Sequence, residues 1–211
     1  MKETGRVEAF SDGVFAIAIT LLVLDLKVPT QPPLLAGLLA QWPVYAAYLI
    51  SFAFILIMWV NHHWMLGHIV RVDGMFMLLN GLLLLGITVV PFPTNVVAQY
   101  VLTPDQNVAT AVYTGWFLMI ALFFNLLWRY AARGGRLLSK DDHEAGLARV
   151  VSARYRWGGP AYLAAFVLSF IWVPAALALS FLLAVFYALP HEMTLPGDTA
   201  SVRPARPARP A

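Results

Sequence analysis

The chain has 211 residues, of which 60% are hydrophobic and only 12% are charged, and its mean hydropathy is +0.72. In soluble domains about a quarter of the residues are charged, and a soluble domain of this size has no interior large enough for so much apolar surface. The composition therefore excludes a cytosolic enzyme, a disordered chain and a compact nucleic-acid-binding domain. The chain contains no cysteine, which excludes disulfides, thiolate metal sites and cysteine nucleophiles.

The first membrane helix is predicted over residues 7–27. Only twelve residues separate Asp12 from Asp25, so a helix long enough to span about 30 Å of hydrocarbon has to carry Asp12 inside it. A cleaved signal peptide is the competing interpretation, because Lys2 and Arg6 precede an apolar core. Asp12 interrupts that core and no small-x-small cleavage site follows it. A helix that starts later, capped by Ser11 or Asp12, leaves too few apolar residues to span.

The later helices are predicted from the gaps between charged residues. A loop over residues 28–43 precedes a second helix over residues 45–59, a third helix lies within residues 73–105, and a fourth lies within residues 105–129. The uncharged stretch from residue 156 to 192 is too long for one comfortable span. Pro174 near its middle predicts a hairpin of two helices with its break at residues 172–175.

These predictions describe an all-α, polytopic membrane protein with six transmembrane helices. Residues 1–190 form the transmembrane domain, and residues 191–211 form a disordered tail rich in proline, arginine and alanine. With both termini in the cytoplasm, thirteen of the fourteen lysines and arginines lie inside, and only Lys27 lies outside. The positive-inside rule favours this six-span topology over five spans.

Polar side chains within the spans are the candidate functional residues. Asp12, Asn80 and one of the adjacent residues His62 and His63 lie at similar depth, which predicts one polar network at the cytoplasmic end. Such a network can serve function or only fix helix packing, and both remain open. A metal site is not expected, because His62 and His63 point about 100° apart and no glutamate accompanies them.

One face of the first helix carries a stripe of four residues at helical spacing: Ile17, Thr20, Leu21 and Leu24. Thr20 is the only polar side chain between Asp12 and Asp25. A lone threonine usually bonds back to its own helix. Periodicity alone therefore favours packing for this stripe.

The segment Arg6-x-x-x-Phe10-Ser11-Asp12 resembles the signature of the transmembrane protein 175 family, which comprises the lysosomal potassium channel and its bacterial relatives. Further segments that resemble this family are Asn61-His62-His63, Arg71-Val72-Asp73, Asn80 and Pro91-Phe92-Pro93-Thr94.

The resemblance implies a potassium-selective channel of a bacterial plasma membrane, a homotetramer with the first helices around a central pore. It implies that Ile17 forms a constriction, that Thr20 aids selectivity, and that Leu21 and Leu24 narrow the pore. The sequence has no T-V-G-Y-G carbonyl filter, and no cofactor is expected beyond the permeant potassium ions. A structural network would hold the first helices in register; its members are Arg6, Phe10, Ser11, Asp12, His62, His63 and Asn80.

A proton-coupled secondary transporter that uses Asp12, His62 and His63 is the main alternative. Transporters usually contain a broken helix near the midplane, and Pro174 is the candidate break. A membrane enzyme would need a nucleophile, a metal set or an acid–base pair at depth, and the sequence offers no convincing one.

Overall fold

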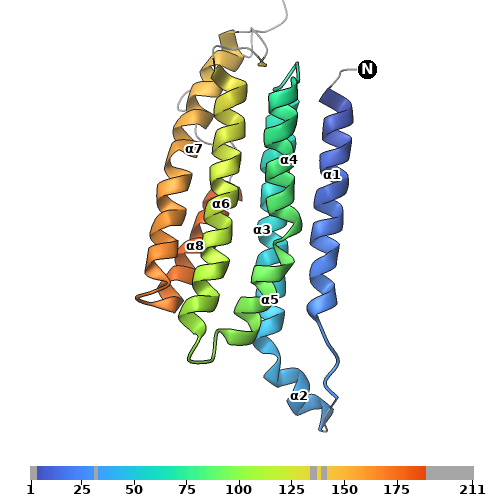
Figure 1. The fold of residues 1–211 in the computed structure, drawn as a ribbon, viewed down its shortest axis with the longest axis vertical. Helices are drawn as coiled ribbons and strands as arrows, with labels where there is room; N and C mark the ends of the chain where they lie inside the picture. The colour runs from blue at the N-terminus through green and yellow to red at the C-terminus, as the bar shows by residue number, and fades with distance from the viewer. Residues whose placement is uncertain (1–3, 31–32, 134–136, 139–141, 189–211) are drawn as a thin grey trace, which may run out of the picture.

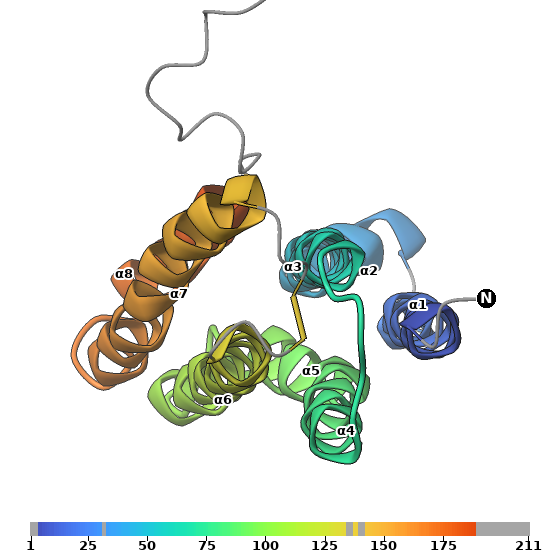
Figure 2. The same cartoon turned by 90° about the horizontal axis from the view of Figure 1, so that it is seen from above.

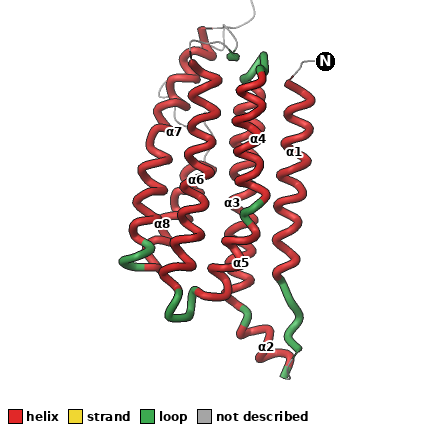
Figure 3. The backbone as a smooth tube through the Cα atoms, viewed as in Figure 1, coloured by secondary structure: helices red, strands yellow, loops and turns green. Residues whose placement is uncertain are grey.

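The computed structural model describes residues 4–30, 33–133, 137–138 and 142–188. These residues form helices, turns and one isolated bridge between Ile69 and Leu138 (Figure 3). The fold is all-α, as predicted. The predicted disordered tail over residues 191–211 lies outside the described residues.

Helix α1 spans Thr4–Leu21 and continues into a short 3-10 turn, Leu22–Asp25. The helix therefore carries Asp12 inside it, and the alternative in which Ser11 or Asp12 caps a later start is wrong. Its buried face carries Ser11, Phe15 and Ala18, three residues at helical spacing. This face packs on α3 and α4, and α1 lies at the edge of the bundle (Figure 2).

The segment over residues 28–43 is not wholly a loop, as the sequence suggested. It contains a short helix, α2, over Leu34–Ala40, in which the described residues are mostly exposed. Helix α3 then spans Trp42–Gly67, longer at both ends than the predicted 45–59. Pro43 fits at its start, because the first helical positions need no backbone N–H.

The single helix predicted within residues 73–105 is broken in two, α4 over Gly74–Thr88 and α5 over Pro91–Tyr100. Proline lacks a backbone N–H, so Pro91 cannot continue the helical ladder. At the break the Val90 N–H bonds the Ile87 carbonyl instead of the Gly86 carbonyl. The freed Gly86 carbonyl accepts a hydrogen bond from the Trp116 indole at 2.9 Å, which compensates for the break.

Helix α6 spans Gln106–Ala132, α7 spans Asp142–Leu168, and α8 spans Val173–Ala188. The predicted hairpin between the last two helices is present. Its break covers residues 169–172, slightly earlier than predicted, because Pro174 starts α8 rather than interrupting a helix. Gly115 permits close approach of α7, since a Cβ there would lie 3.1 Å from the Phe166 ring.

The long helices run side by side along the longest axis of the molecule (Figure 1). Four segments are long and apolar enough to cross a membrane: Thr4–Asp25, Trp42–Gly67, Gly74–Tyr100 and Gln106–Ala132. Helix α8 is a shorter apolar helix. The described residues therefore support a polytopic membrane protein with at least these four candidate spans.

Candidate functional site

Three helices meet through a buried hydrogen-bonded chain of Ser11, Asn80 and His62. The Asn80 Nδ2 donates to Ser11 Oγ at 3.0 Å, and Asn80 Oδ1 lies 2.7 Å from His62 Nε2. All three residues are buried, and the rings of Phe15 and Phe124 lie beside His62. The chain therefore ties α1 to α4 and α4 to α3.

The direction of each bond in this chain follows from Ser11. Its hydroxyl donates to the Val7 carbonyl at 2.8 Å, so its oxygen has to accept from the Asn80 amide nitrogen. The Asn80 oxygen then faces His62, which places the proton on His62 Nε2. The other ring nitrogen, Nδ1, is buried without a hydrogen-bond partner among the described residues.

Asp12 is not a member of this chain, contrary to the predicted single network. Its Oδ1 accepts from the Trp59 indole at 2.8 Å. His63 also lies apart from the chain, because its Nδ1 lies 3.2 Å from Glu8 Oε1. Glu8, Asp12 and His63 form the group of possible metal ligands found within the described ranges. Sequence reasoning missed Glu8 and Trp59, although Glu8 lies four residues before Asp12 and so shares its helix face.

Arg6 and Phe10 do not join the buried chain within the described part of the molecule. Both are exposed, and they line a surface cavity of about 720 Å³ between α1 and α4. Asn80 also lines this cavity, although its side chain is largely buried. The residues of the motif Arg6-x-x-x-Phe10-Ser11-Asp12 thus lie on different faces of α1: Ser11 faces the bundle, and Phe10 faces outward.

The stripe predicted on the first helix is exposed in the protomer. Ile17 is 60% exposed and Leu24 is 68% exposed, and Thr20 and Leu21 are also exposed. The Thr20 hydroxyl lies 2.9 Å from the carbonyls of both Ala16 and Ile17. Its proton is therefore held by its own helix, and a lone pair of the oxygen is left to face outward. The stripe does not pack within the protomer.

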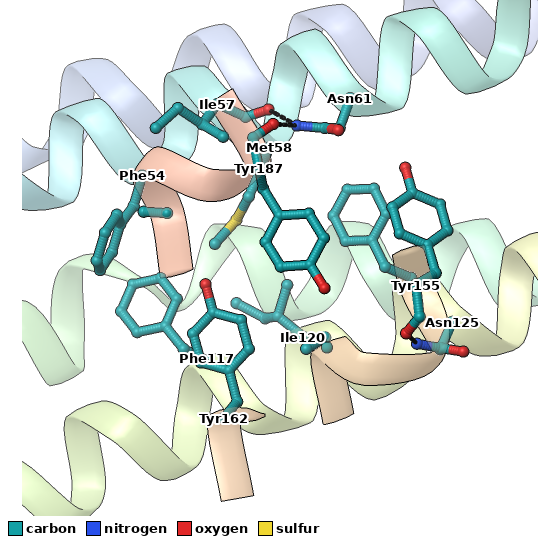
Figure 4. Close-up of a pocket in the computed structure, with 14 residues that line it drawn as sticks. Phe54, Ile57, Met58, Asn61, Phe117, Ile120, Asn125, Tyr155, Tyr162 and Tyr187 are labelled. Carbon is teal, nitrogen blue, oxygen red and sulfur yellow. Dashed lines mark hydrogen bonds between the residues drawn. The ribbon is translucent and has the colours of Figure 1, made fainter. Parts of the chain in front are cut away.

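A second candidate site is an apolar cavity of about 70 Å³ among α3, α6, α7 and α8 (Figure 4). At its edge the Asn61 Nδ2 donates to the Ile57 carbonyl and to the Tyr187 carbonyl, at 2.8 and 3.0 Å. Tyr187 lies in the last turn of α8, where backbone carbonyls lack partners within the helix. Asn61 therefore caps the end of α8 from α3.

Asn61→Ala should free the end of α8. The loss of the bond to Tyr187 is partly offset, because Asn61 Oδ1 is itself buried without a hydrogen-bond partner among the described residues. We expect a net destabilisation of about 1 kcal/mol, which lowers the unfolding midpoint by about 2–4 °C. Amide hydrogen exchange should speed up in α8. The neighbouring exposed Val60 is the control, since Val60→Ala should change neither quantity. Unchanged exchange in α8 would contradict the capping role.

Comparisons with known proteins identify the family. The family described as the endosomal/lysosomal potassium channel TMEM175 matches residues 6–91. A potassium channel of Chamaesiphon minutus is 50% identical over 194 residues, which cover 89% of this chain and 94% of the relative. The chain belongs to the TMEM175 family. A potassium channel of Streptomyces collinus is 46% identical over 206 residues, which cover 95% of this chain and 98% of the relative.

The fold agrees with a solved TMEM175 structure. The crystal structure of a lysosomal potassium-selective channel TMEM175 homolog from Chamaesiphon minutus superposes with a TM-score of 0.81 at 49% identity. The superposition covers 89% of this chain and 97% of the chain of the Chamaesiphon minutus homolog. The TMEM175 family consists of ion channels rather than enzymes, and the resemblance that the first-helix motif predicted is therefore confirmed.

Proposed function

We propose that this chain is a potassium-selective cation channel that assembles as a homotetramer in a bacterial plasma membrane. In this proposal four copies of α1 surround a central pore that conducts potassium ions, and conduction needs no cofactor. The sequence identity with the potassium channels named above supports potassium as the permeant ion. The exposed stripe Ile17, Thr20, Leu21 and Leu24 is the observation that supports the pore lining.

The chemistry of the stripe suits a pore without a carbonyl filter. A ring of four Ile17 side chains, with rings of Leu21 and Leu24 beyond it, would close the pore by excluding water. A ring of four Thr20 oxygens would replace part of the hydration shell of an ion. Since the Thr20 proton is already held by the helix backbone, each hydroxyl presents an acceptor to a cation.

Ion selectivity is the direct test of the proposal. Purified protein in planar bilayers, with potassium on one side and sodium on the other, should give unitary currents that reverse near the potassium equilibrium potential. Reversal near zero would contradict potassium selectivity. Saturating, pH-driven flux without unitary steps would instead support the secondary transporter.

The transporter alternative is less well supported by the polar groups. A proton relay through Asp12, His62 and His63 needs them within reach of one another. In the described residues Asp12 and His63 lie within 4.8 Å of each other beside Glu8. His62, however, bonds Asn80 through Nε2, and its Nδ1 has no hydrogen-bond partner among these residues, so it is not linked to the other two. The break between α4 and α5 is the structural feature that fits a transporter, and its freed carbonyl is already bonded by Trp116.

We infer six spans with both termini in the cytoplasm, with α7 and α8 as the fifth and sixth. A reporter fused after Gly197 should therefore read as cytoplasmic. A fusion after Thr103, in the turn between α5 and α6, should read as external. A cytoplasmic signal at both positions, or an external signal at Gly197, would contradict the six-span topology.

Thr20→Val should lower the preference for potassium over sodium. The substitution keeps the shape of the side chain and removes the oxygen, which is worth about 1 kcal/mol, or roughly a fivefold fall in the permeability ratio. The control is Thr88→Val on α4, because Thr88 is also exposed and bonds back to its own helix at Leu85. Both variants should express and assemble normally. An unchanged ratio in Thr20→Val would contradict the selectivity role.

A further inference from the structure

Two carboxylates of α1 and an imidazole of α3 converge beside the buried Ser11–Asn80–His62 chain. Glu8 and Asp12 are four residues apart and share one face of α1. His63 reaches this face from α3, in the span that runs antiparallel to α1. One ligand atom from each of the three side chains lies within 4.8 Å of the other two.

The spacing of Glu8 and His63 matches that of two ligands on one metal ion. His63 Nδ1 and Glu8 Oε1 lie 3.2 Å apart. Two ligands at zinc distances of about 2.0–2.2 Å lie about 3.4 Å apart in tetrahedral geometry. To complete such a set, the Asp12 carboxylate has to move about 1–1.5 Å closer to the other two ligand atoms. Rotation of the side chain is enough for such a movement.

Asp12 can serve as a third metal ligand without losing its hydrogen bond from Trp59. Trp59 donates to Oδ1 only, which leaves Oδ2 for a metal ion. A hydrogen bond of this kind fixes the orientation of a carboxylate ligand and is worth about 10–100-fold in metal affinity. The protomer does not cover the site, since the His63 side chain is 55% exposed and the Glu8 side chain is 31% exposed.

We propose that Glu8, Asp12 and His63 bind a divalent transition-metal ion, represented by Zn²⁺, at the end of the bundle that carries the amino terminus. Imidazole selects such ions over Mg²⁺ and Ca²⁺, which favour sites made of oxygen ligands alone. A divalent ion also relieves the repulsion between the two carboxylates. Because the ligands come from both α1 and α3, the bound ion links these two helices.

Direct binding tests the site independently of any current. Metal-free protein titrated with Zn²⁺ in a calorimeter should bind one ion per chain at this site. His63→Ala and the near-isosteric Glu8→Gln should each weaken that binding at least tenfold, because loss of a ligand costs no less than loss of a supporting hydrogen bond. Both variants should elute in the volume of the wild type.

His68→Ala is the matched control. His68 lies five residues after His63, just past the end of α3, where it bonds the Trp64 carbonyl and its ring lies 4.1 Å from the Trp64 ring. This variant should keep wild-type binding. Equal binding in the wild type and His63→Ala, or loss of binding in His68→Ala alone, would overturn the assignment. Tighter binding of Mg²⁺ than of Zn²⁺ would overturn the metal class.

The regulatory consequence rests on the proposed pore function. If α1 lines the pore, an ion that fixes α1 against α3 should reduce potassium current when Zn²⁺ is added on the side of the amino terminus. The reduction should be lost in His63→Ala and kept in His68→Ala. Equal inhibition of the wild type and His63→Ala would overturn this coupling. Zinc binding without any potassium current would overturn the channel proposal and leave the metal site intact.

Discussion

Asn80→Leu is expected to destabilise the folded chain by about 1–3 kcal/mol, which is roughly a five- to 150-fold shift in the folding equilibrium. The substitution leaves the fully buried His62 Nε2–H without an acceptor. Hydrogen bonds between transmembrane helices average only about 0.6 kcal/mol, because the unfolded chain in the membrane also finds partners. We expect more here, because the imidazole is fully buried and apolar rings flank it.

The double variant separates the lost bond from lost packing. Asn80→Leu combined with His62→Leu removes both partners, and replacing both by apolar groups is close to neutral. The double variant should therefore recover most of the stability that the single variant loses. Denaturation followed by the intrinsic fluorescence of the seven tryptophans measures the stability of the single and the double variants. A double variant that is destabilised by the sum of the single effects would contradict the importance of this bond.

The depth of the polar residues along the membrane was predictable from the sequence. The rotation of each helix about its own axis, which decides the face that is buried, was not. The gaps between charges placed Asp12, Asn80 and the two histidines at one end of the bundle. Which of them touch depends on the buried face of α1, which carries Ser11, Phe15 and Ala18. This face brings Ser11 to Asn80 and turns Asp12 toward Trp59. Hydropathy contains no such information, because both faces of α1 are apolar.

The break between α4 and α5 shows a second limit of the sequence. Pro91 and Pro93 lie in an uninterrupted apolar stretch, so charge gaps treat the stretch as one helix. The prolines disfavour a continuous helix, and a partner for the freed carbonyl lowers the cost of the break. That partner, Trp116, comes from α6 and is thirty residues away from Gly86 in the chain. The α7–α8 hairpin was predictable, in contrast, because length alone required a break near Pro174.

The stripe of α1 is exposed in the protomer, and its environment is set by what surrounds the protomer. In the sequence it was indistinguishable from a packing face, and in the protomer its members contact no other helix closely enough to be buried. An exposed apolar face in a membrane protein meets lipid, another chain or a pore. Leu85 on α4 is exposed to the same 60% as Ile17, so exposure does not separate these environments. A polar substitution does separate them.

Ile17→Asn should raise the current at least tenfold and lower ion selectivity. In the proposed tetramer it places four amides where four apolar side chains exclude water. A gain in hydration of only about 0.8 kcal/mol per chain, the value of one CH₂, sums to about 3 kcal/mol over four chains. Each 1.4 kcal/mol is a tenfold change in the population of the wetted state. Single-channel recording measures both the open probability and the reversal potential.

Leu85→Asn is the matched control for this substitution, because it introduces the same amide at an equally exposed position of another helix. If α4 faces lipid there, the control should reduce the amount of inserted protein and leave the current per channel and its selectivity unchanged. If Ile17 only packs against a neighbouring chain, Ile17→Asn should weaken assembly and give less current than the wild type. The opposite signs of these two outcomes for Ile17→Asn distinguish a constriction from a packing contact, since only a dry pore conducts better when its narrowest ring becomes polar.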